Sequence, residues 1–156
     1  MAAVGTSRLY RPEPAWMETP EACHRARFAA RRLSSSRVLV TVEGDIDATN
    51  GRSLGRYVER NTGASMQLVL DLSGVNFFGT EGFAALHYIS VSCARNDMDW
   101  MIVGGRDVRR LVRICDPEEI LPLADRLESA LARLDRIAGR HNPARWPAEP
   151  RPAQSN

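Results

Sequence analysis

The feature that most constrains the fold is a regular alternation of short apolar runs with segments of helical periodicity. The strand candidates are residues 27–33, 37–44, 67–73, 100–105 and 119–123, and the helix candidates are residues 47–63, 83–93, 107–115 and 124–140. Strands separated by helices need crossover connections, which favour parallel pairing. The run Ser34–Ser36 favours an antiparallel hairpin between the first two strands. We therefore predict an α/β fold, with a mixed, mostly parallel sheet of about five strands and four helices packed against it.

Apolar spacing and capping residues set the expected helix boundaries. Asp47 or Thr49 can cap the first helix, Thr80 the second and Asp107 the third, because their side-chain oxygens can accept a backbone N–H. Residues 74–82 are expected to form a loop between the central strand and the second helix. Phe83 begins the apolar stripe of that helix, so we assign it to the core.

The ends of the chain are rich in proline and lack periodicity. We expect an N-terminal tail over residues 1–21, one domain over residues 22–138 and a Pro-rich C-terminal tail over residues 139–156. A chain of 156 residues with 44% hydrophobic residues fits one globular core. The net charge is +2 and the arginines are scattered, so no nucleic-acid partner is expected. No apolar run is long enough to enter a membrane, and we expect a cytoplasmic protein.

Residues that could carry enzyme chemistry are sparse. The cysteines and histidines have no metal-ligand spacing, so we expect neither a metal nor a cofactor. Cys93 and Cys115 lie on apolar helix faces, where buried thiols are the favoured interpretation and a redox pair is the alternative. Gly104 and Gly105 lack the third glycine and the lysine of phosphate-binding loops, so a nucleotide-binding enzyme is only a third choice of function.

Three stretches in this order carry a family resemblance: "VLVTVEGDIDATNGRSL", "LVLDLSGVNFFGTEGFAAL" and "DVRRLVRICDPEEILPLADRLESAL". Over residues 22–134 the chain resembles STAS domains, specifically bacterial anti-sigma factor antagonists. The resemblance implies a protein that is not an enzyme. It implies binding to an anti-sigma factor that is also an ATP-dependent protein kinase, which frees a sigma factor. Phosphorylation of a serine or threonine at the start of the second helix would switch this binding off.

The family motif places its phosphoacceptor immediately before a glycine, and here that position is Glu81, followed by Gly82. Thr80 is then the candidate for a displaced phosphoacceptor. A carboxylate or a phosphate is tolerated at this place, because the first turn of a helix carries free N–H groups and the positive end of the macrodipole. The residues expected to contact the partner are Asp45, Asp47, Asn50, Phe78, Gly79, Glu81 and Gly82.

Several alternatives stay open on the sequence alone. Asp45 and Asp47 can equally be turn and capping residues. Glu81 can imitate the phosphorylated state in part, pair with an arginine of a divergent partner, or leave Thr80 as the acceptor; we rank the arginine pair first. The chain can instead be a scaffold subunit in a stress-signalling assembly or a lipid-transport ATPase complex. A weak homodimer is also open.

Overall fold

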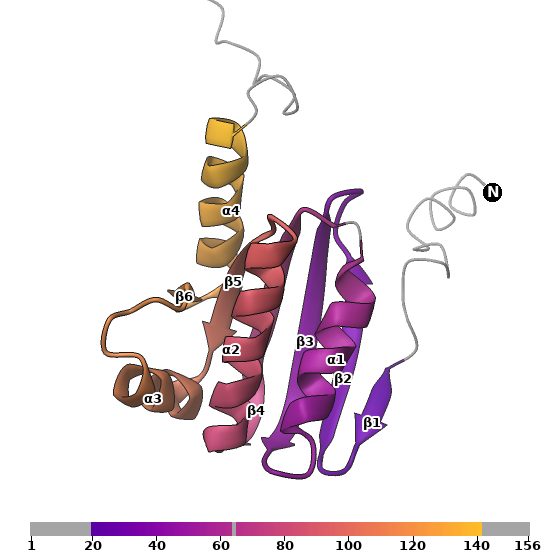
Figure 1. Ribbon diagram of the computed structural model, residues 1–156, viewed down its shortest axis with the longest axis vertical. Helices are drawn as coiled ribbons and strands as arrows, with labels where there is room; N and C mark the ends of the chain where they lie inside the picture. The colour runs from indigo at the N-terminus through magenta and orange to yellow at the C-terminus, as the bar shows by residue number, and fades with distance from the viewer. Residues whose placement is uncertain (1–19, 64, 142–156) are drawn as a thin grey trace, which may run out of the picture.

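The computed structural model describes residues 20–63 and 65–141, which form a six-stranded sheet with four helices (Figure 1). The strands, which follow one another across the sheet in sequence order, are β1 (Glu21–Cys23), β2 (Ala26–Arg32), β3 (Arg37–Ile46), β4 (Gln67–Phe78), β5 (Asp99–Gly104) and β6 (Leu123–Ala124). The helices are α1 (Gly51–Thr62), α2 (Thr80–Arg95), α3 (Arg106–Cys115) and α4 (Leu127–His141). The predicted α/β class is confirmed, with one strand more than expected.

As expected, the N-terminal strands pair antiparallel and the strands joined through helices pair parallel. β2 pairs antiparallel with β3, which confirms the predicted opening hairpin, and the unpredicted β1 extends it by a further antiparallel pair. The pairs β3–β4, β4–β5 and β5–β6 are all parallel and each is joined through a helix or a helix-containing connection. Since parallel crossovers are right-handed, strands taken in sequence order place their connecting helices on one face.

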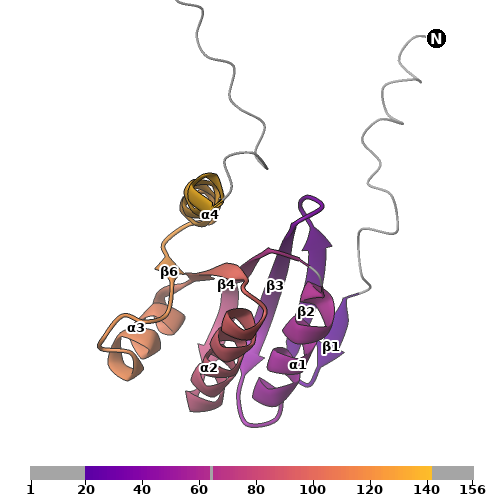
Figure 2. The same ribbon diagram turned by 45° about the horizontal axis from the view of Figure 1, so that its top comes forward.

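The sheet separates two hydrophobic clusters. The larger cluster lies under α1, α2 and α3 and contains fully buried side chains such as Phe28, Leu70 and Ile102. The smaller cluster lies on the other face, where Val69 and Met101 of the sheet pack with Leu134 of α4. Figures 1 and 2 show α1 and α2 side by side over the strands and α4 apart from them.

A polar clamp fixes α4 on its face of the sheet. The amide of Gln67, at the start of β4, donates to the backbone oxygen of Leu134 at 2.9 Å and accepts from Nε of Arg37 at 2.8 Å. The same arginine donates to Asp135 of α4 at 2.6 Å. Gln67 is buried, so these bonds also satisfy polar atoms that would otherwise be costly to bury.

Several predicted boundaries were wrong. β4 continues to Phe78, so most of the expected loop over residues 74–82 is strand, because residues 74–78 continue the pairing with β3. Of the last predicted strand, residues 119–123, only Leu123 is strand, and β6 adds Ala124, which we predicted as part of the following helix. α4 begins three residues later than the expected helix over residues 124–140 and ends one residue beyond it.

The expected N-caps were also displaced. The N-cap positions are Asn50 for α1, Gly79 for α2 and Gly105 for α3, and none of the three makes a side-chain capping bond. Thr80 and Asp107 lie inside the first turns that they were expected to cap. Pairing of the preceding strands fixes where each helix begins, which overrides the local preference of these side chains for the cap.

α2 approaches the end of β4 so closely that only glycine fits at the contact. A Cβ atom on Gly82 would lie 2.6–2.8 Å from three ring atoms of Phe78, whose side chain is buried. Replacement by any larger residue must therefore move either the ring or the helix. Gly139 in α4 has no such neighbour within 4 Å.

We predict that Gly82→Ala lowers the free energy of unfolding by about 1–3 kcal/mol, because the added methyl overlaps the Phe78 ring. Gly139→Ala is the matched control, since it adds the same methyl to a helix with open space. It should leave stability unchanged or raise it by up to about 1 kcal/mol. Urea unfolding of the two variants and the native chain gives both values. Equal stability of the two variants would contradict the close contact.

Candidate functional site

The candidate site lies at the edge of the sheet where two neighbouring parallel strands end. Asp45 pairs with Phe77 and Ile46 with Phe78 at the ends of β3 and β4. The backbone N–H of Gly79 donates to the oxygen of Ile46 at 2.9 Å, which continues the pairing by one bond. Because α1 and α2 follow these strands, their N-termini meet at the same edge, where parallel α/β sheets commonly bind ligands.

Gly44 starts the irregular backbone that carries β3 to this edge. Its φ of 96° lies in the left-handed region, and a Cβ atom there would lie 2.1 Å from the backbone oxygen of Arg25. The register of β3 against β4 shifts on either side of Gly44, as in a β-bulge. The glycine of the "GDID" motif therefore lets the strand pass β2 and redirects residues 45–50.

The buried side chain of Asn50 fixes the connection between β3 and α1. Its Oδ1 accepts the backbone N–H of Asp47 at 2.9 Å, and its Nδ2 donates to the backbone oxygens of Asp45 at 2.8 Å and Cys23 at 3.3 Å. Only 1% of Asn50 is exposed. Asn50 is therefore a structural support below the surface, and it ties the end of β1 to the same connection.

Asp47 organises the exposed part of this connection. Its carboxylate accepts hydrogen bonds from the hydroxyl and the backbone N–H of Thr49, and these bonds lower the pKa of Asp47 below its ordinary value. Of the two roles left open by the sequence, the structure gives Asp47 that of a turn residue. Its carboxylate remains partly accessible, so it also adds negative charge to the edge.

The first turn of α2 presents a hydroxyl and a carboxylate to solvent. Thr80 and Glu81 are both exposed, and the Thr80 hydroxyl lies 3.4 Å from Oε2 of Glu81, to which it can donate. On the neighbouring helix, Gly51 faces the backbone of Glu81 so closely that an added Cβ would lie 2.8 Å from its carbonyl oxygen. The position of Glu81 is thus set by the packing of α1 against α2.

The structure divides the predicted contact residues into an outer and an inner set. Glu81 is exposed and Gly79, Asp45 and Asp47 are partly exposed, whereas Asn50, Phe78 and Gly82 are buried. Sequence reasoning missed the ring that is accessible here: Phe77 is 54% exposed, while Phe78 is 6% exposed. Alternation along a strand was the available signal, since neighbouring side chains point to opposite faces.

Chemically reactive groups are not gathered at this edge. The cysteines among the described residues are free, and burial raises the pKa of the Cys93 thiol to about 12, which keeps it protonated at neutral pH. Gly104 packs against Val108, so the "GG" turn serves the contact of β5 with α3. Across residues 20–63 and 65–141, no three His, Cys, Asp or Glu side chains are grouped as metal ligands.

A search for membrane-spanning helices gave none in the part of the chain that the structure describes. The described helices include polar faces, and the longest, α2, has sixteen residues.

Comparison with known proteins places these features in a family. Residues 29–130 match the family model of the STAS domain. The chain is 31% identical over 101 residues to the anti-sigma-F factor antagonist RsfA of Mycobacterium tuberculosis (strain CDC 1551 / Oshkosh), covering 62% of this chain and 79% of that protein. It is 30% identical over 97 residues to osmosensory protein A of M. tuberculosis (strain ATCC 25618 / H37Rv), covering 60% and 61%.

Among solved structures, the fold is similar to an anti-sigma factor antagonist from Mycobacterium paratuberculosis. The TM-score is 0.57 at 21% sequence identity, and the match covers 74% of this chain and 98% of that one. At this identity the likeness concerns the fold.

We predict that Asn50→Ala lowers the free energy of unfolding by about 1–3 kcal/mol, because it leaves buried backbone groups of Asp45 and Asp47 without their partner. Thr49→Ala, next to it on the surface, should cost less than half as much. Urea unfolding gives the stabilities, and amide hydrogen exchange of Asp47 should accelerate in Asn50→Ala only. Similar losses in both variants would contradict the supporting role of Asn50.

Proposed function

The chain belongs to the STAS domain family, and we propose that it is an anti-sigma factor antagonist, which binds an anti-sigma factor and so frees a sigma factor. The observation that carries the proposal is the rigid edge at the ends of β3 and β4, which exposes Phe77, Thr80 and Glu81 at the position of the family motif. A relative named as an anti-sigma-F factor antagonist supports it. A site of action in the cytoplasm follows, because sigma factors act there.

The proposed contact surface consists of Phe77, Thr80 and Glu81, with Asp45 and Asp47 at its border. An aromatic ring with a carboxylate beside it can bury apolar area and also pair with a basic group, a combination typical of interface centres. Asn50, Phe78 and Gly82 act from below by fixing the backbone. This assignment moves three of the predicted contact residues from direct contact to support.

We propose a partner of the protein-kinase type, as the family resemblance implies, but with an altered switch. A phosphoserine or phosphothreonine carries up to two negative charges and three acceptor oxygens, whereas Glu81 carries one charge that no phosphatase removes. Glu81 stands in the first turn of α2, where the macrodipole favours negative charge in the folded chain. Its charge is therefore constantly available to the partner.

Of the three roles open to Glu81, pairing with an arginine or lysine of the partner remains our first choice. Glu81 is exposed, and in the described residues its carboxylate contacts the Thr80 hydroxyl and no basic side chain. Within residues 20–63 and 65–141, its charge is therefore not already paired with a basic group. If Glu81 pairs with a basic group, removal of its charge weakens binding. If Glu81 imitates the phosphorylated state in part, removal of its charge strengthens binding.

A scaffold subunit is the second candidate function. The relative named osmosensory protein A favours a place in a stress-signalling assembly, although this chain covers only 61% of that protein. In such an assembly the same edge would bind its partner without a regulatory switch. The carboxylate of Glu81, which no phosphatase removes, is compatible with such constant binding. Recovery of a kinase-like anti-sigma factor, or of other assembly subunits, with the tagged native chain would separate the two functions.

We predict that Glu81→Gln weakens binding to the cognate anti-sigma factor by about five- to tenfold and that Glu81→Arg weakens it further, because a pair with a basic group is lost and then replaced by repulsion. Glu128→Gln is the matched control, since Glu128 occupies the first turn of α4 as Glu81 does in α2. Isothermal titration calorimetry against purified anti-sigma factors measures the affinities.

Tighter binding of Glu81→Gln would instead identify Glu81 as a partial imitation of phosphate. Unchanged binding in both Glu81 variants would remove this surface from the interface. A comparable loss in Glu128→Gln would indicate a general effect of net charge.

We further predict that the cognate kinase does not label the native chain at Thr80 but does label Glu81→Ser at the new hydroxyl. The substitution restores the acceptor position of the family motif, whereas Thr80 lies one residue earlier. Incubation with ATP followed by mass spectrometry locates the phosphate, and the double variant Thr80→Ala, Glu81→Ser shows whether both positions react. Phosphate on Thr80 of the native chain would establish the displaced acceptor.

A further inference from the structure

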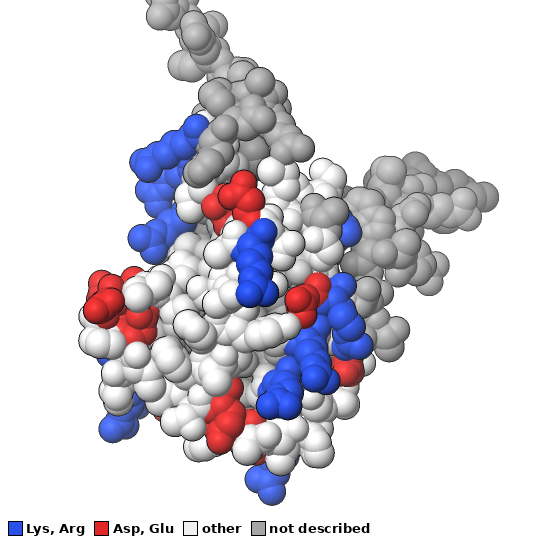
Figure 3. All heavy atoms as spheres, viewed as in Figure 1, with Lys and Arg blue, Asp and Glu red and all other residues white. Residues whose placement is uncertain are grey.

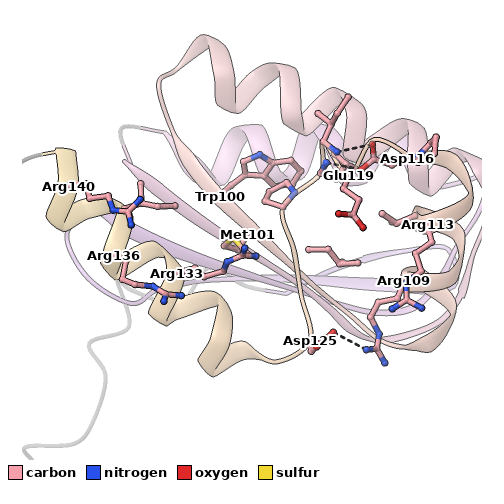
Figure 4. Close-up of a pocket in the computed structure, with 17 residues that line it drawn as sticks. Trp100, Met101, Arg109, Arg113, Asp116, Glu119, Asp125, Arg133, Arg136 and Arg140 are labelled. Atoms are coloured by element: carbon pink, nitrogen blue, oxygen red, sulfur yellow. Dashed lines mark hydrogen bonds and ion pairs between the residues drawn. The ribbon is translucent and has the colours of Figure 1, made fainter.

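A second surface feature lies away from the candidate site. A groove of about 1090 Å³ runs between α3, the segment that leads to β6, the start of β5 and α4 (Figure 4). Trp100 and Met101 of β5 lie at its centre, and arginines enter it from α3 and from α4.

The α4 wall of the groove is basic. Arg133, Arg136 and Arg140 are exposed and lie at i, i+3 and i+7, so they share one face of the helix. Figure 3 shows a basic patch over α4, at the upper left of the view. The ion pairs found between described residues involve other arginines, namely Arg37, Arg60 and Arg109, so the charge of this face is not compensated there.

The loop of residues 116–120, across the groove from α4, is acidic and carries an apolar tip, while the neighbouring helix α3 contributes Arg109 and Arg113 to the groove. Glu118 and Glu119 are exposed, and Ile120 beside them is 69% exposed. The buried carboxylate of Asp116 accepts the backbone N–H of Ile120 at 3.1 Å and that of Leu121 at 2.8 Å. These bonds hold the loop in one conformation, so Glu118, Glu119 and Ile120 are presented to solvent at little entropic cost of ordering.

We propose that a second copy of this chain docks on this groove, with the loop of residues 116–120 of each copy against α4 of the other. A two-fold axis makes such an interface isologous: the glutamates of each copy meet the arginines of its partner twice. Ile120 supplies apolar area toward Trp100 and Ile137, which line the groove. Charged rims and one apolar tip per copy predict a weak dimer that dissociates with salt.

The mixed charge of the groove favours this occupant over a polyanion. Glu119 and Asp125 line the groove together with the arginines, so a nucleic acid or an anionic membrane would meet repulsion as well as attraction there. A second copy brings both signs in the complementary arrangement.

The interface is independent of the proposed function. Figure 1 places α4 at the opposite end of the molecule from the connections β3–α1 and β4–α2, so the α4 half of the interface lies away from the candidate site.

Two charge-reversed forms of the full chain test the pairing. The first carries Arg133→Glu and Arg136→Glu, and the second carries Glu118→Arg and Glu119→Arg. Each form alone should be monomeric, because like charges then face each other across both halves of the interface. In an equimolar mixture every contact is again between opposite charges, so the two forms should pair with each other. Analytical ultracentrifugation measures all three samples.

The native chain should show concentration-dependent dimerisation, with the dimer dissociation constant rising at least about tenfold between about 0.05 M and 0.5 M salt. Arg27→Glu with Arg31→Glu makes the same change of charge on exposed positions of β2 and should dimerise like the native chain. Circular dichroism and urea unfolding check that every form is folded.

A native chain that stays monomeric up to millimolar concentration would overturn the proposal. So would a dimer that survives the α4 reversal, or two folded monomeric forms that fail to pair when mixed. Binding of duplex DNA or phosphatidylserine vesicles, lost with Arg133→Glu and Arg136→Glu in a monomeric chain, would assign the groove to a polyanion instead.

Discussion

The parallel pairing of β3 with β4 is the constraint on which the candidate site depends. The pairing runs to the last residues of both strands, so the chain leaves the sheet twice at one edge. Each exit leads through a short connection into a helix, so the N-termini of α1 and α2 come together at this edge. Two helix N-termini side by side create a positive local field, which favours carboxylates such as Asp47 and Glu81 at this edge.

The sequence was sufficient for the architecture because hydrophobic periodicity distinguishes the elements strongly. Leu54, Tyr57 and Val58 of α1, predicted as one face, are all buried, and the valines at alternate positions of β3 face the core. Helix starts were predicted less well. Thr80 has the right chemistry for an N-cap, but the pairing of Gly79 with Ile46 fixes the helix one residue earlier, which is a tertiary effect that local preferences do not contain.

The sequence was sufficient to locate the site. It was not sufficient to separate the exposed residues of the site from the buried residues that support them. The "GDID" and "GTEG" stretches are far apart in the chain, and the family resemblance alone brought them into one surface. Which of the two adjacent phenylalanines faces solvent depends on the register of β4. Because residues 74–82 were predicted as a loop, the alternation of side chains along a strand was not applied to them. The clamp of Arg37, Gln67 and Asp135 could not be predicted from the sequence either, because it joins residues up to 98 positions apart.

Under the proposed function, a carboxylate at Glu81 in place of an acceptor hydroxyl changes where regulation can act. In a chain whose acceptor is phosphorylated, affinity for the partner is set by covalent modification of the edge itself. Under the proposed function, a carboxylate in that place gives the edge an affinity that phosphorylation at this position cannot change, so the amount of free chain and its state of assembly become the variables. A dimer formed through α4 and the loop of residues 116–120 would carry two open edges. Simultaneous engagement of both by a two-site partner raises the effective concentration of the second contact, and regulation then follows from the concentration dependence of the dimer.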